Sequence, residues 1–343
     1  MPLDKYLPRT VKTGPNGERL MTSAMIASIA APGQKTAPAP FGAALTALAA
    51  KNPKIIGMTA DLSKYTDLHV FAKAYPDRFY QMGMAEQVLM GAAAGMAREG
   101  FTVFATTYAV FASRRAYDFI CMAIAEESLD VKIVCALPGL TTGYGPSHQA
   151  TEDLAIFRGL PNMTIIDPCD ALEIEQATAA IAKHKGPVYM RLLRGNVPLV
   201  LDEYGYKFKL GKAQMLRDGP DALLISSGLM TMRALEAAKA LEKDRLHVGV
   251  LHVPTIKPLD EATILKHAKK RGRPVITLEN HSIIGGLGEA VAGVLMRSDK
   301  RPARFRQIAL PDQFLDAGAL PTLHDRYGIS TSEVVRRVKE WVV

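Results

Sequence analysis

Four side chains in this sequence stand beside predicted strand ends and could bind a ligand or move a proton. Glu86 lies in QMGMAEQ, among apolar neighbours at the start of a predicted helix, where the helix dipole favours a carboxylate. His148 lies on the loop GYGPSHQATED, and a histidine can transfer protons near neutral pH. Arg194 in RLLRGN could hold a carboxylate or phosphate through its planar fork. Phe111 could offer an aromatic face to a flat ring.

Each of these side chains also has a purely structural explanation. Glu86 fits a simple acid at a helix N-terminus, His148 a solvated loop residue, and Arg194 a structural ion pair. Phe111 fits core packing, and the two arginines that follow it in ASRRAYD fit surface ion pairs. The glycine-rich ENHSIIGGLGEA could cradle a phosphate, but close packing of a strand on a helix explains its glycines as well. The local patterns leave these alternatives open.

Predicted strands and helices alternate along the chain from residue 40 onward, and they define the surroundings of these side chains. Apolar runs such as KIIGMTADL and VKIVCALPG predict buried strands, and stretches such as AEQVLMGAAAGMAREG predict helices. This alternation is typical of a parallel sheet that is covered by helices on both faces. Ligands bind at the carboxyl ends of the strands in such sheets, which is where we expect the candidate residues.

The pattern repeats after the polar stretch VLDEYGYKFKLG and therefore predicts two units. We expect an α/β fold with two doubly wound domains, a mostly parallel-sheet domain over residues 36–200 and a smaller α/β domain over residues 201–343. Residues 1–35 are rich in Pro, Gly, Ser and Thr, and we interpret them as an N-terminal arm. In the second unit, LHVGVLHVPTIKPLD predicts one strand with a proline-rich exit, and Ser330 or Thr331 is the expected cap of the last helix.

Composition excludes several classes of protein. The chain has 343 residues, of which 48% are hydrophobic and 22% charged, and these values exclude a disordered or fibrous protein. No apolar stretch reaches the roughly 20 residues that a membrane span needs. The net charge of +8 suits anionic substrates, but the basic residues are too scattered for us to expect nucleic-acid binding. Three cysteines without metal-ligand spacing argue against disulfides and zinc, so we expect a cytoplasmic protein whose own residues bind no metal.

Taken together and in order, the motifs resemble the C-terminal half of transketolase. The resemblance runs from about residue 38 to the C-terminus, and the chain looks like the separate small subunit of a split transketolase. GMAEQ resembles the family motif around an invariant glutamate, and GPSHQATEDLAIFRGLPNM resembles the family's GPTHQ segment with its downstream arginine and PNM. RLLRGN and SIIGGLGEAV are similar to segments of deoxyxylulose-phosphate synthases and split transketolases. The two units would then be the pyrimidine-binding domain and the transketolase C-terminal domain.

The resemblance implies an enzyme that transfers a two-carbon ketol unit from a ketose donor to an aldose acceptor with thiamine diphosphate as its cofactor. It implies that Glu86 hydrogen-bonds the aminopyrimidine of the cofactor and promotes its imino tautomer. Phe111 would stack on that ring, and Met84 would lie beside it. These three residues are the implied cofactor contacts of this chain.

The resemblance also implies a set of substrate contacts. His148 would face the substrate and help to shuttle protons during ketol transfer. Arg194 would bind the distal anion of the substrate. Gln149 is a weaker neighbour of the site, and Tyr144 stands where the family commonly has an Asp that contacts a sugar hydroxyl.

The sequence lacks the family's diphosphate-binding GDG motif and the downstream Asn that holds magnesium. The resemblance therefore implies an N-terminal partner subunit that supplies the diphosphate and Mg²⁺ half of a shared site. The expected assembly is an α2β2 heteromer. Thiamine diphosphate would be bound between the chains, and all protein ligands of Mg²⁺ would lie on the partner.

Substrate recognition differs from the family pattern at three places. Tyr144 replaces the usual Asp, residues 37–40 read APAP in place of a phosphate-binding Thr-Arg, and residues 136–138 read ALP in place of an upstream histidine. Losing an arginine removes a bidentate contact to phosphate. We therefore expect a non-standard sugar or sugar-phosphate substrate.

Two other functions remain open. The chain could be a decarboxylating subunit similar to deoxyxylulose-phosphate synthase or to the beta subunit of a 2-oxo-acid dehydrogenase, and RRAYD and RLLRGN favour the synthase. It could also be a transketolase-like subunit that is kept only for assembly. Loss of the glutamate is the expected sign of that second class, and Glu86 is present.

Overall fold

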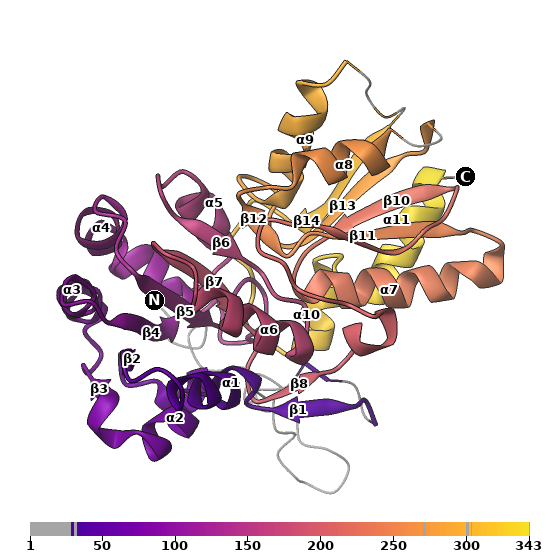
Figure 1. Cartoon of the computed structure of the whole chain (residues 1–343). Coiled ribbons are helices and arrows are strands. Elements are labelled where there is room, and N and C mark those ends of the chain that lie inside the picture. Colours follow the sequence, from indigo (N-terminus) through magenta and orange to yellow (C-terminus); the bar gives the residue numbers. More distant parts are fainter. Residues whose placement is uncertain (1–28, 31–32, 270–271, 300–301, 303, 343) are drawn as a thin grey trace, which may run out of the picture.

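The structure is a computed structural model that shows two α/β units side by side, the first at the lower left and the second at the upper right of Figure 1. It describes residues 29–30, 33–269, 272–299, 302 and 304–342. Most of the predicted N-terminal arm lies outside the described residues, and the predicted domain boundaries stay a prediction. Within the described part, none of the helices is both long and apolar enough to cross a bilayer.

A seven-stranded sheet forms the centre of the first unit. Its strands are β2 (Ile55–Thr59), β3 (Phe79–Gln81), β4 (Thr102–Tyr108), β5 (Val131–Ala136), β6 (Thr164–Ile166), β7 (Val188–Leu192) and β12 (Thr255–Lys257). They lie in the order β12-β6-β7-β5-β4-β2-β3, and every pair from β6 to β3 is parallel. This confirms the predicted parallel sheet.

Helices cover both faces of this sheet (Figure 1). They are α1 (Pro40–Ala49), α2 (His69–Ala74), α3 (Glu86–Arg98), α4 (Tyr117–Phe119), α5 (Asp153–Arg158) and α6 (Ala171–Ile181). Because successive side chains of a strand point to opposite faces, Phe104 packs with α1, α2 and α6, whereas Val103 and Ala105 pack with α3 and α5. The sheet therefore separates two apolar cores, which explains the uninterrupted apolar runs of its strands.

The second unit has a five-stranded sheet in the order β14-β13-β10-β11-β9, parallel except for the edge strand β9. Its strands are β9 (Gln214–Arg217), β10 (Ala222–Ser226), β11 (Val248–His252), β13 (Val275–Ser282) and β14 (Phe305–Leu310). Its helices are α7 (Leu229–Leu241), α8 (Glu261–Ala268), α9 (Leu287–Met296), α10 (Leu320–Arg326) and α11 (Thr331–Val342). Ser330 caps α11, as expected, by accepting a hydrogen bond from the amide of Glu333. Both apolar cores continue from the first unit into this one.

The segment predicted as one strand with a proline-rich exit is two strands in different sheets. β11 joins the second sheet, whereas β12 leaves it and pairs antiparallel with β6 of the first sheet, with Thr255 opposite Ile166. Pro254 lies between them, and its carbonyl accepts a hydrogen bond from the amide of Asp167. A proline has no amide hydrogen to continue a ladder, so the chain changes sheets there. The two units are thus joined by a shared sheet.

A two-stranded ribbon closes the base of the first unit. β1 (Thr36–Pro38) pairs antiparallel with β8 (Asn196–Pro198), which follows β7. The amide of Ala39 donates to the carbonyl of Gly195 at 2.7 Å. The segment that reads APAP in the sequence therefore lies directly beside the chain after Arg194.

A buried ion pair lies where the two units meet. Arg191 on β7 donates to both carboxylate oxygens of Asp153, at 2.5 and 2.9 Å, and to the carbonyl of Asn280 in the second unit at 3.2 Å. Ser227 of the second unit donates to Asp167, which also faces Arg191. Burial alone would raise the pKa of Asp153, but the charge and hydrogen bonds of Arg191 hold it below its usual range. The pair is therefore ionised at neutral pH.

Replacing Arg191 should destabilise the chain strongly. Arg191→Met leaves the buried carboxylates of Asp153 and Asp167 without their cation, and we expect a loss of about 3–5 kcal/mol in the free energy of unfolding. Urea denaturation measures this difference. The control is Arg336→Met, which breaks an exposed pair with Glu333 and should cost below about 1 kcal/mol. Equal losses in the two variants would contradict the assignment.

Candidate active site

Glu86 is a buried carboxylate at the carboxyl edge of the first sheet. β3 ends at Gln81, and Gly83, with φ of 68°, turns the chain so that Glu86 becomes the first residue of α3. Its side chain is only 2% exposed. Nη1 of Arg115 donates to Oε2 at 2.6 Å, while Oε1 receives one long contact of 3.5 Å from the hydroxyl of Thr107. Oε1 therefore retains the capacity to accept a further hydrogen bond.

β4 leads into a π-helical turn, η5 (Phe111–Arg115), that brings an aromatic ring and a guanidinium together. The amide of Ala116 donates to the carbonyl of Phe111, five residues back, so the turn is wider than in an α-helix. Cζ of Arg115 lies 4.7 Å from the centre of the Phe111 ring, within the range of a cation–π contact. Arg115 therefore bridges Phe111 and Glu86.

His148 lies on the loop between β5 and α5 and packs among three aromatic rings. Its ring centre is 5.5 Å from that of Phe111, 5.3 Å from Tyr144 and 6.1 Å from Tyr108. The hydroxyl of Ser147 lies 2.9 Å from Nδ1. Partial burial lowers the pKa of His148, which favours the neutral imidazole. A neutral imidazole can both accept and donate a proton.

Arg194 follows β7 and has donors to spare. Its Cζ lies 5.3 Å from the centre of the Tyr65 ring, and its Nε is buried without a hydrogen-bond partner. Nearby, both oxygens of Asp67 accept from the amide of Gly195, at 3.1 and 3.2 Å. Burial raises the pKa of Asp67 to about 6, although the Gly195 amide and the charge of Arg194 act in the opposite direction. The guanidinium can therefore bind an additional anionic group.

Tyr108, at the end of β4, links these groups. Its ring contacts those of Phe111 and His148. Burial raises the pKa of Tyr108, the charge of Arg194 lowers it, and Tyr144 raises it further. The predicted site residues on four separate segments thus meet at one edge of the sheet. We call this group the site cluster: Tyr65, Asp67, Glu86, Tyr108, Phe111, Arg115, Tyr144, His148 and Arg194.

The sequence prediction missed Tyr65, Asp67 and Tyr108, and it gave Arg115 only a surface ion pair. A signal was available, because Tyr108 ends the strand FTVFATTY and the other two follow the strand KIIGMTADL. The carboxyl ends of neighbouring parallel strands meet at the same edge. Arg115 does form an ion pair, but its partner is the buried Glu86. Nothing local in RRAYD identifies that partner, since the two residues are on different elements.

Both units of the chain match known protein families. The model of the transketolase pyrimidine-binding domain matches residues 35–200, and that of the transketolase C-terminal domain matches residues 211–334. An uncharacterized transketolase family protein from Sinorhizobium fredii is 74% identical over 324 residues, which are 94% of this chain and 94% of that protein. The chain belongs to the transketolase family.

Other transketolase relatives span nearly the same length as this chain. A 6-deoxy-6-sulfo-D-fructose transketolase subunit from a Clostridium strain is 37% identical, and the alignment covers 85% of this chain and 90% of that subunit. A solved split gene transketolase, described as an inactive beta4 tetramer, is 40% identical with a TM-score of 0.79. It matches 88% of this chain and 96% of its own. Transketolase from Campylobacter jejuni, at 20% identity and a TM-score of 0.73, shares the fold over 91% of this chain and 48% of its own.

Three further residues are predicted from the transketolase resemblance. Met84 is 78% exposed, and Tyr144 is 46% exposed beside His148. Gln149 is buried, and its Nε2 donates to the carbonyls of Thr142 and Asp316, at 3.2 and 3.1 Å. Gln149 thereby ties the His148 loop to the second unit. The roles of these residues toward cofactor and substrate stay predictions.

The glycine-rich segment of the transketolase C-terminal domain holds a side chain of the protein itself. Glu279 accepts hydrogen bonds from the amides of Leu287 and Gly288, at 2.6 and 2.8 Å, at the start of α9. Burial raises the pKa of Glu279 to about 7, and these two amides act against that rise. A Cβ on Gly286 would collide with Glu279. Close packing therefore explains these glycines, and an internal carboxylate holds the place that a phosphate would need.

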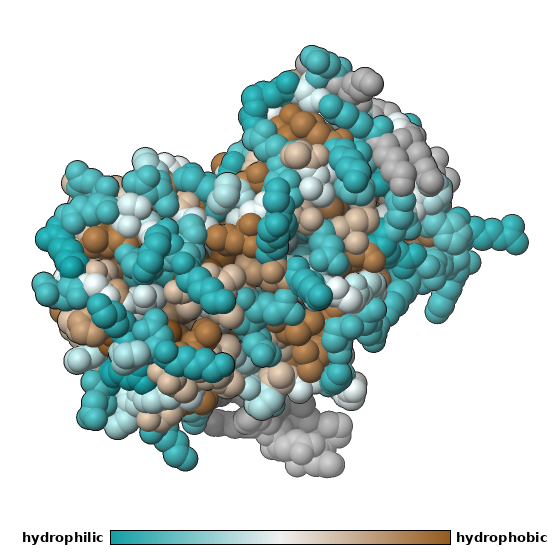
Figure 2. Space-filling model, viewed as in Figure 1, coloured by the Kyte–Doolittle hydropathy of each residue, from teal (hydrophilic) through white to brown (hydrophobic). Residues whose placement is uncertain are grey.

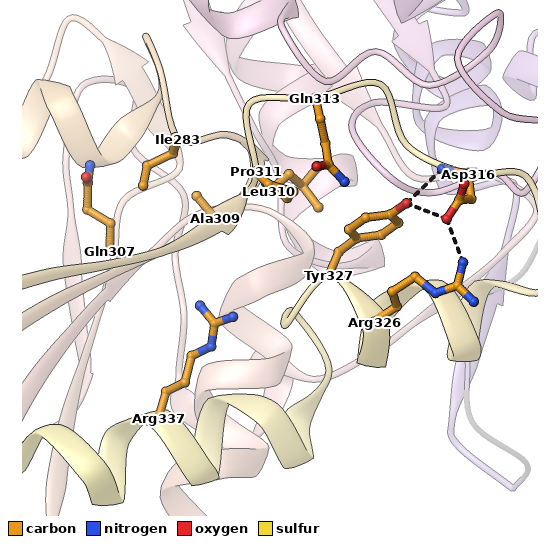
Figure 3. Close-up of a pocket in the computed structure, with 10 residues that line it drawn as sticks. All are labelled: Ile283, Gln307, Ala309, Leu310, Pro311, Gln313, Asp316, Arg326, Tyr327 and Arg337. Atoms are coloured by element: carbon orange, nitrogen blue, oxygen red, sulfur yellow. Dashed lines mark hydrogen bonds and ion pairs between the residues drawn. The ribbon is translucent and has the colours of Figure 1, made fainter.

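One cavity in the described part of the chain lies outside the site cluster. It has a volume of about 480 Å³ and lies in the second unit, with Tyr327 and Arg337 on its walls (Figure 3). The hydroxyl of Tyr327 donates to Asp316, whose carbonyl accepts from Gln149 of the His148 loop. The cavity is thus connected to the loop that carries His148 through Asp316, and Glu86 is not among its lining residues.

The raised pKa of Asp67 predicts a pH-dependent effect on stability. Its contribution is fully present below a pH of about 4, where the carboxyl is protonated in both states, and is lost as the pH rises through about 6. Asp67→Asn, which can still accept from Gly195, should avoid this loss. From about pH 4 to 7, its free energy of unfolding relative to the original chain should rise by up to about 3 kcal/mol in urea titrations.

The matched control is Asp77→Asn, because the Asp77 side chain is exposed. It should show no such rise relative to the original chain. The same pH dependence in both variants would contradict burial of the Asp67 charge.

Proposed function

We propose that this chain is the C-terminal, pyrimidine-binding subunit of a two-chain transketolase. The proposed reaction moves a two-carbon ketol unit from a ketose donor to an aldose acceptor. The observation that carries the proposal is the buried Glu86, whose Oε1 has only one long contact. Arg115 contacts both Glu86 and the ring of Phe111 and so links the two residues. A buried carboxylate with spare acceptor capacity is uncommon unless it binds something.

The site cluster fits the aminopyrimidine half of thiamine diphosphate. When bound, the cofactor supplies the nucleophilic carbon that takes up and releases the two-carbon unit. Oε1 of Glu86 can accept a hydrogen bond from the ring, and Phe111 can stack on it. The carboxylate and the ring face are the two features that a flat, nitrogen-rich ring needs.

The other residues of the cluster suit a polar, anionic substrate. His148 is neutral by its lowered pKa and can exchange a proton with a sugar hydroxyl. The rings of Tyr108, Tyr144 and Phe111 lie around it and shield it in part from water. The unpartnered Nε of Arg194 favours a substrate with a distal anion.

A partner subunit would complete the site. No group of three His, Cys, Asp or Glu residues in the described part of the chain is arranged to hold a metal ion, so the Mg²⁺ ligands are proposed to lie on the N-terminal partner. Large apolar side chains are exposed around α3. Met84 lies just before it, Val88 lies on it, and Phe119 and Met122 lie on elements that contact it. Figure 2 shows apolar patches on the lobe that the first unit forms. Such surfaces suit an obligate partner. One relative is named as a transketolase subunit and a split gene transketolase was solved as a beta4 tetramer, which supports an assembly of several subunits, and we propose α2β2.

The proposed substrate is a ketose with a distal group other than that of the common pentose phosphates. The APAP segment, residues 37–40, lies beside Gly195 and offers apolar side chains where the family commonly has an arginine. Tyr144 lies beside His148 in place of the family's Asp. A relative named for a sulfonated fructose supports a non-standard sugar.

A decarboxylating activity is the second candidate. A 1-deoxy-D-xylulose-5-phosphate synthase from Syntrophotalea carbinolica is 34% identical over 303 residues, and this chain covers 47% of its length. Release of carbon dioxide from pyruvate by the assembled protein would favour this candidate over ketol transfer. The presence of Glu86 in a buried, partly satisfied state argues against a subunit kept only for assembly.

Replacing Glu86 tests catalysis directly. Glu86→Gln keeps the shape of the side chain but removes the carboxylate, and we expect ketol transfer by the complex with its N-terminal subunit to fall by about 10²–10⁴-fold. The measurement is the rate of aldose formation from a panel of ketoses. The control is Glu99→Gln, at the exposed far end of α3, which should keep full activity. Full activity of Glu86→Gln would refute a catalytic subunit.

Cofactor binding should require the partner. Calorimetric titration of thiamine diphosphate with Mg²⁺ should give tight binding only when the N-terminal subunit is present. The diphosphate and the metal need ligands that we assign to that subunit. Tight binding to this chain alone would show that the missing half of the site has been misassigned.

A further inference from the structure

Arg115 contacts the two residues that we have proposed for the aminopyrimidine, Glu86 and Phe111, and on Glu86 it uses the other carboxylate oxygen. Its Nη1 lies 2.6 Å from Oε2 of Glu86, and its Cζ lies 4.7 Å from the centre of the Phe111 ring. A guanidinium is flat, carries N–H donors at its edge and stacks on aromatic faces. These are also the properties that an aminopyrimidine would use at this place.

We propose that Arg115 is a latch that occupies the pyrimidine subsite and must swing outward before the cofactor ring can enter. The inference rests on the proposed function and adds a regulatory step to it. A ring that stacks on Phe111 and hydrogen-bonds Oε1 of Glu86 would lie between the same two residues that the guanidinium bridges through Oε2. Arg115 and the ring therefore compete for one place.

Burial of Glu86 explains why the subsite holds a cation. A carboxylate that is 2% exposed is costly to keep ionised unless a charged or polar partner stays close. Arg115 provides that partner on the chain by itself. Its side chain is 43% exposed, so the guanidinium can leave toward solvent without unfolding its surroundings. The latch thus protects an isolated subunit from an unpaired buried charge.

The π-helical turn explains why this arginine, and not its neighbour, reaches the subsite. The wide turn brings Arg115 over the ring of Phe111, the first residue of the turn. Arg114 points elsewhere: it pairs with Glu152 and donates to the carbonyl of Pro146 at 2.8 Å. The two adjacent arginines thus have separate roles, one on the His148 loop and one on Glu86.

The first test measures whether the pair stabilises the chain without cofactor. Arg115→Met should lower the melting temperature by about 2–4 °C, because it leaves the Glu86 carboxylate unpaired. In the Glu86→Gln background the same substitution should have little effect. The matched control is Arg98→Met, at the far end of the helix that begins with Glu86. It breaks an exposed pair with Glu127 and should give the same small change in both backgrounds. An equal loss for Arg115→Met in both backgrounds would overturn the pairing.

The second test measures cofactor binding. Thiamine diphosphate with Mg²⁺ is titrated by calorimetry into the complex of each variant with the N-terminal subunit. The apparent dissociation constant rises when a site is held closed, so Arg115→Met should bind roughly tenfold more tightly than the original chain. Arg115→Lys keeps the charge but lacks the planar fork, and it should also bind more tightly. If Arg115→Met does not fold, Arg115→Lys takes its place in this measurement.

The outcomes separate the two proposals. Unchanged or weaker binding by both Arg115 variants, with normal binding by the original complex, would overturn the latch and leave the proposed function intact. It would mean that Arg115 stays on Glu86 in the loaded site. Absence of binding by the original complex would overturn both. Arg98→Met should bind the cofactor like the original chain. An equal gain in binding by this variant would overturn the assignment of the effect to Arg115.

Discussion

The buried pair of Arg191 and Asp153 is the interaction on which the arrangement of the site depends. Arg191 lies three residues before Arg194, and Asp153 follows His148 on the next short helix. By joining β7 to α5, the pair fixes the distance between the two loops that carry these side chains. Arg191 also donates a hydrogen bond to the carbonyl of Asn280, and this bond ties the second unit to the first. The charges are costly to bury, and their mutual satisfaction makes this one arrangement preferred over others.

The transketolase C-terminal domain supports the site, and none of its described residues belongs to the site cluster. Gln149 binds the carbonyl of Asp316, and Leu140 donates through its amide to the side chain of Asn280 at 2.8 Å. Both contacts hold the connection between β5 and α5 against the second unit. The amides at the start of α9 are already used by Glu279, so this domain offers no free anion cradle at that helix. Its contribution to the site cluster is positional.

The sequence was sufficient to predict a mostly parallel sheet, two α/β units and the strand ends that carry Glu86, His148 and Arg194. Alternation of apolar runs reports local structure, and parallel topology then places carboxyl ends together. It was insufficient for β12, because a strand of three residues, TIK, carries no information on which sheet it will join. It also missed the pairing of Arg115 with Glu86, which depends on a π-helical turn that no local pattern signals. The motif resemblance supplied the cofactor, which the spacing of residues alone would not have identified.

The strand that crosses between the sheets has a consequence for how the protein can be divided. β12 belongs by sequence to the second unit, yet it covers the edge of β6 in the first. A fragment cut between the units would leave β6 as a bare edge, with amide and carbonyl groups that can recruit a strand from another molecule. An expression fragment of the first unit should therefore keep β12, because that strand covers the edge that β6 would otherwise expose.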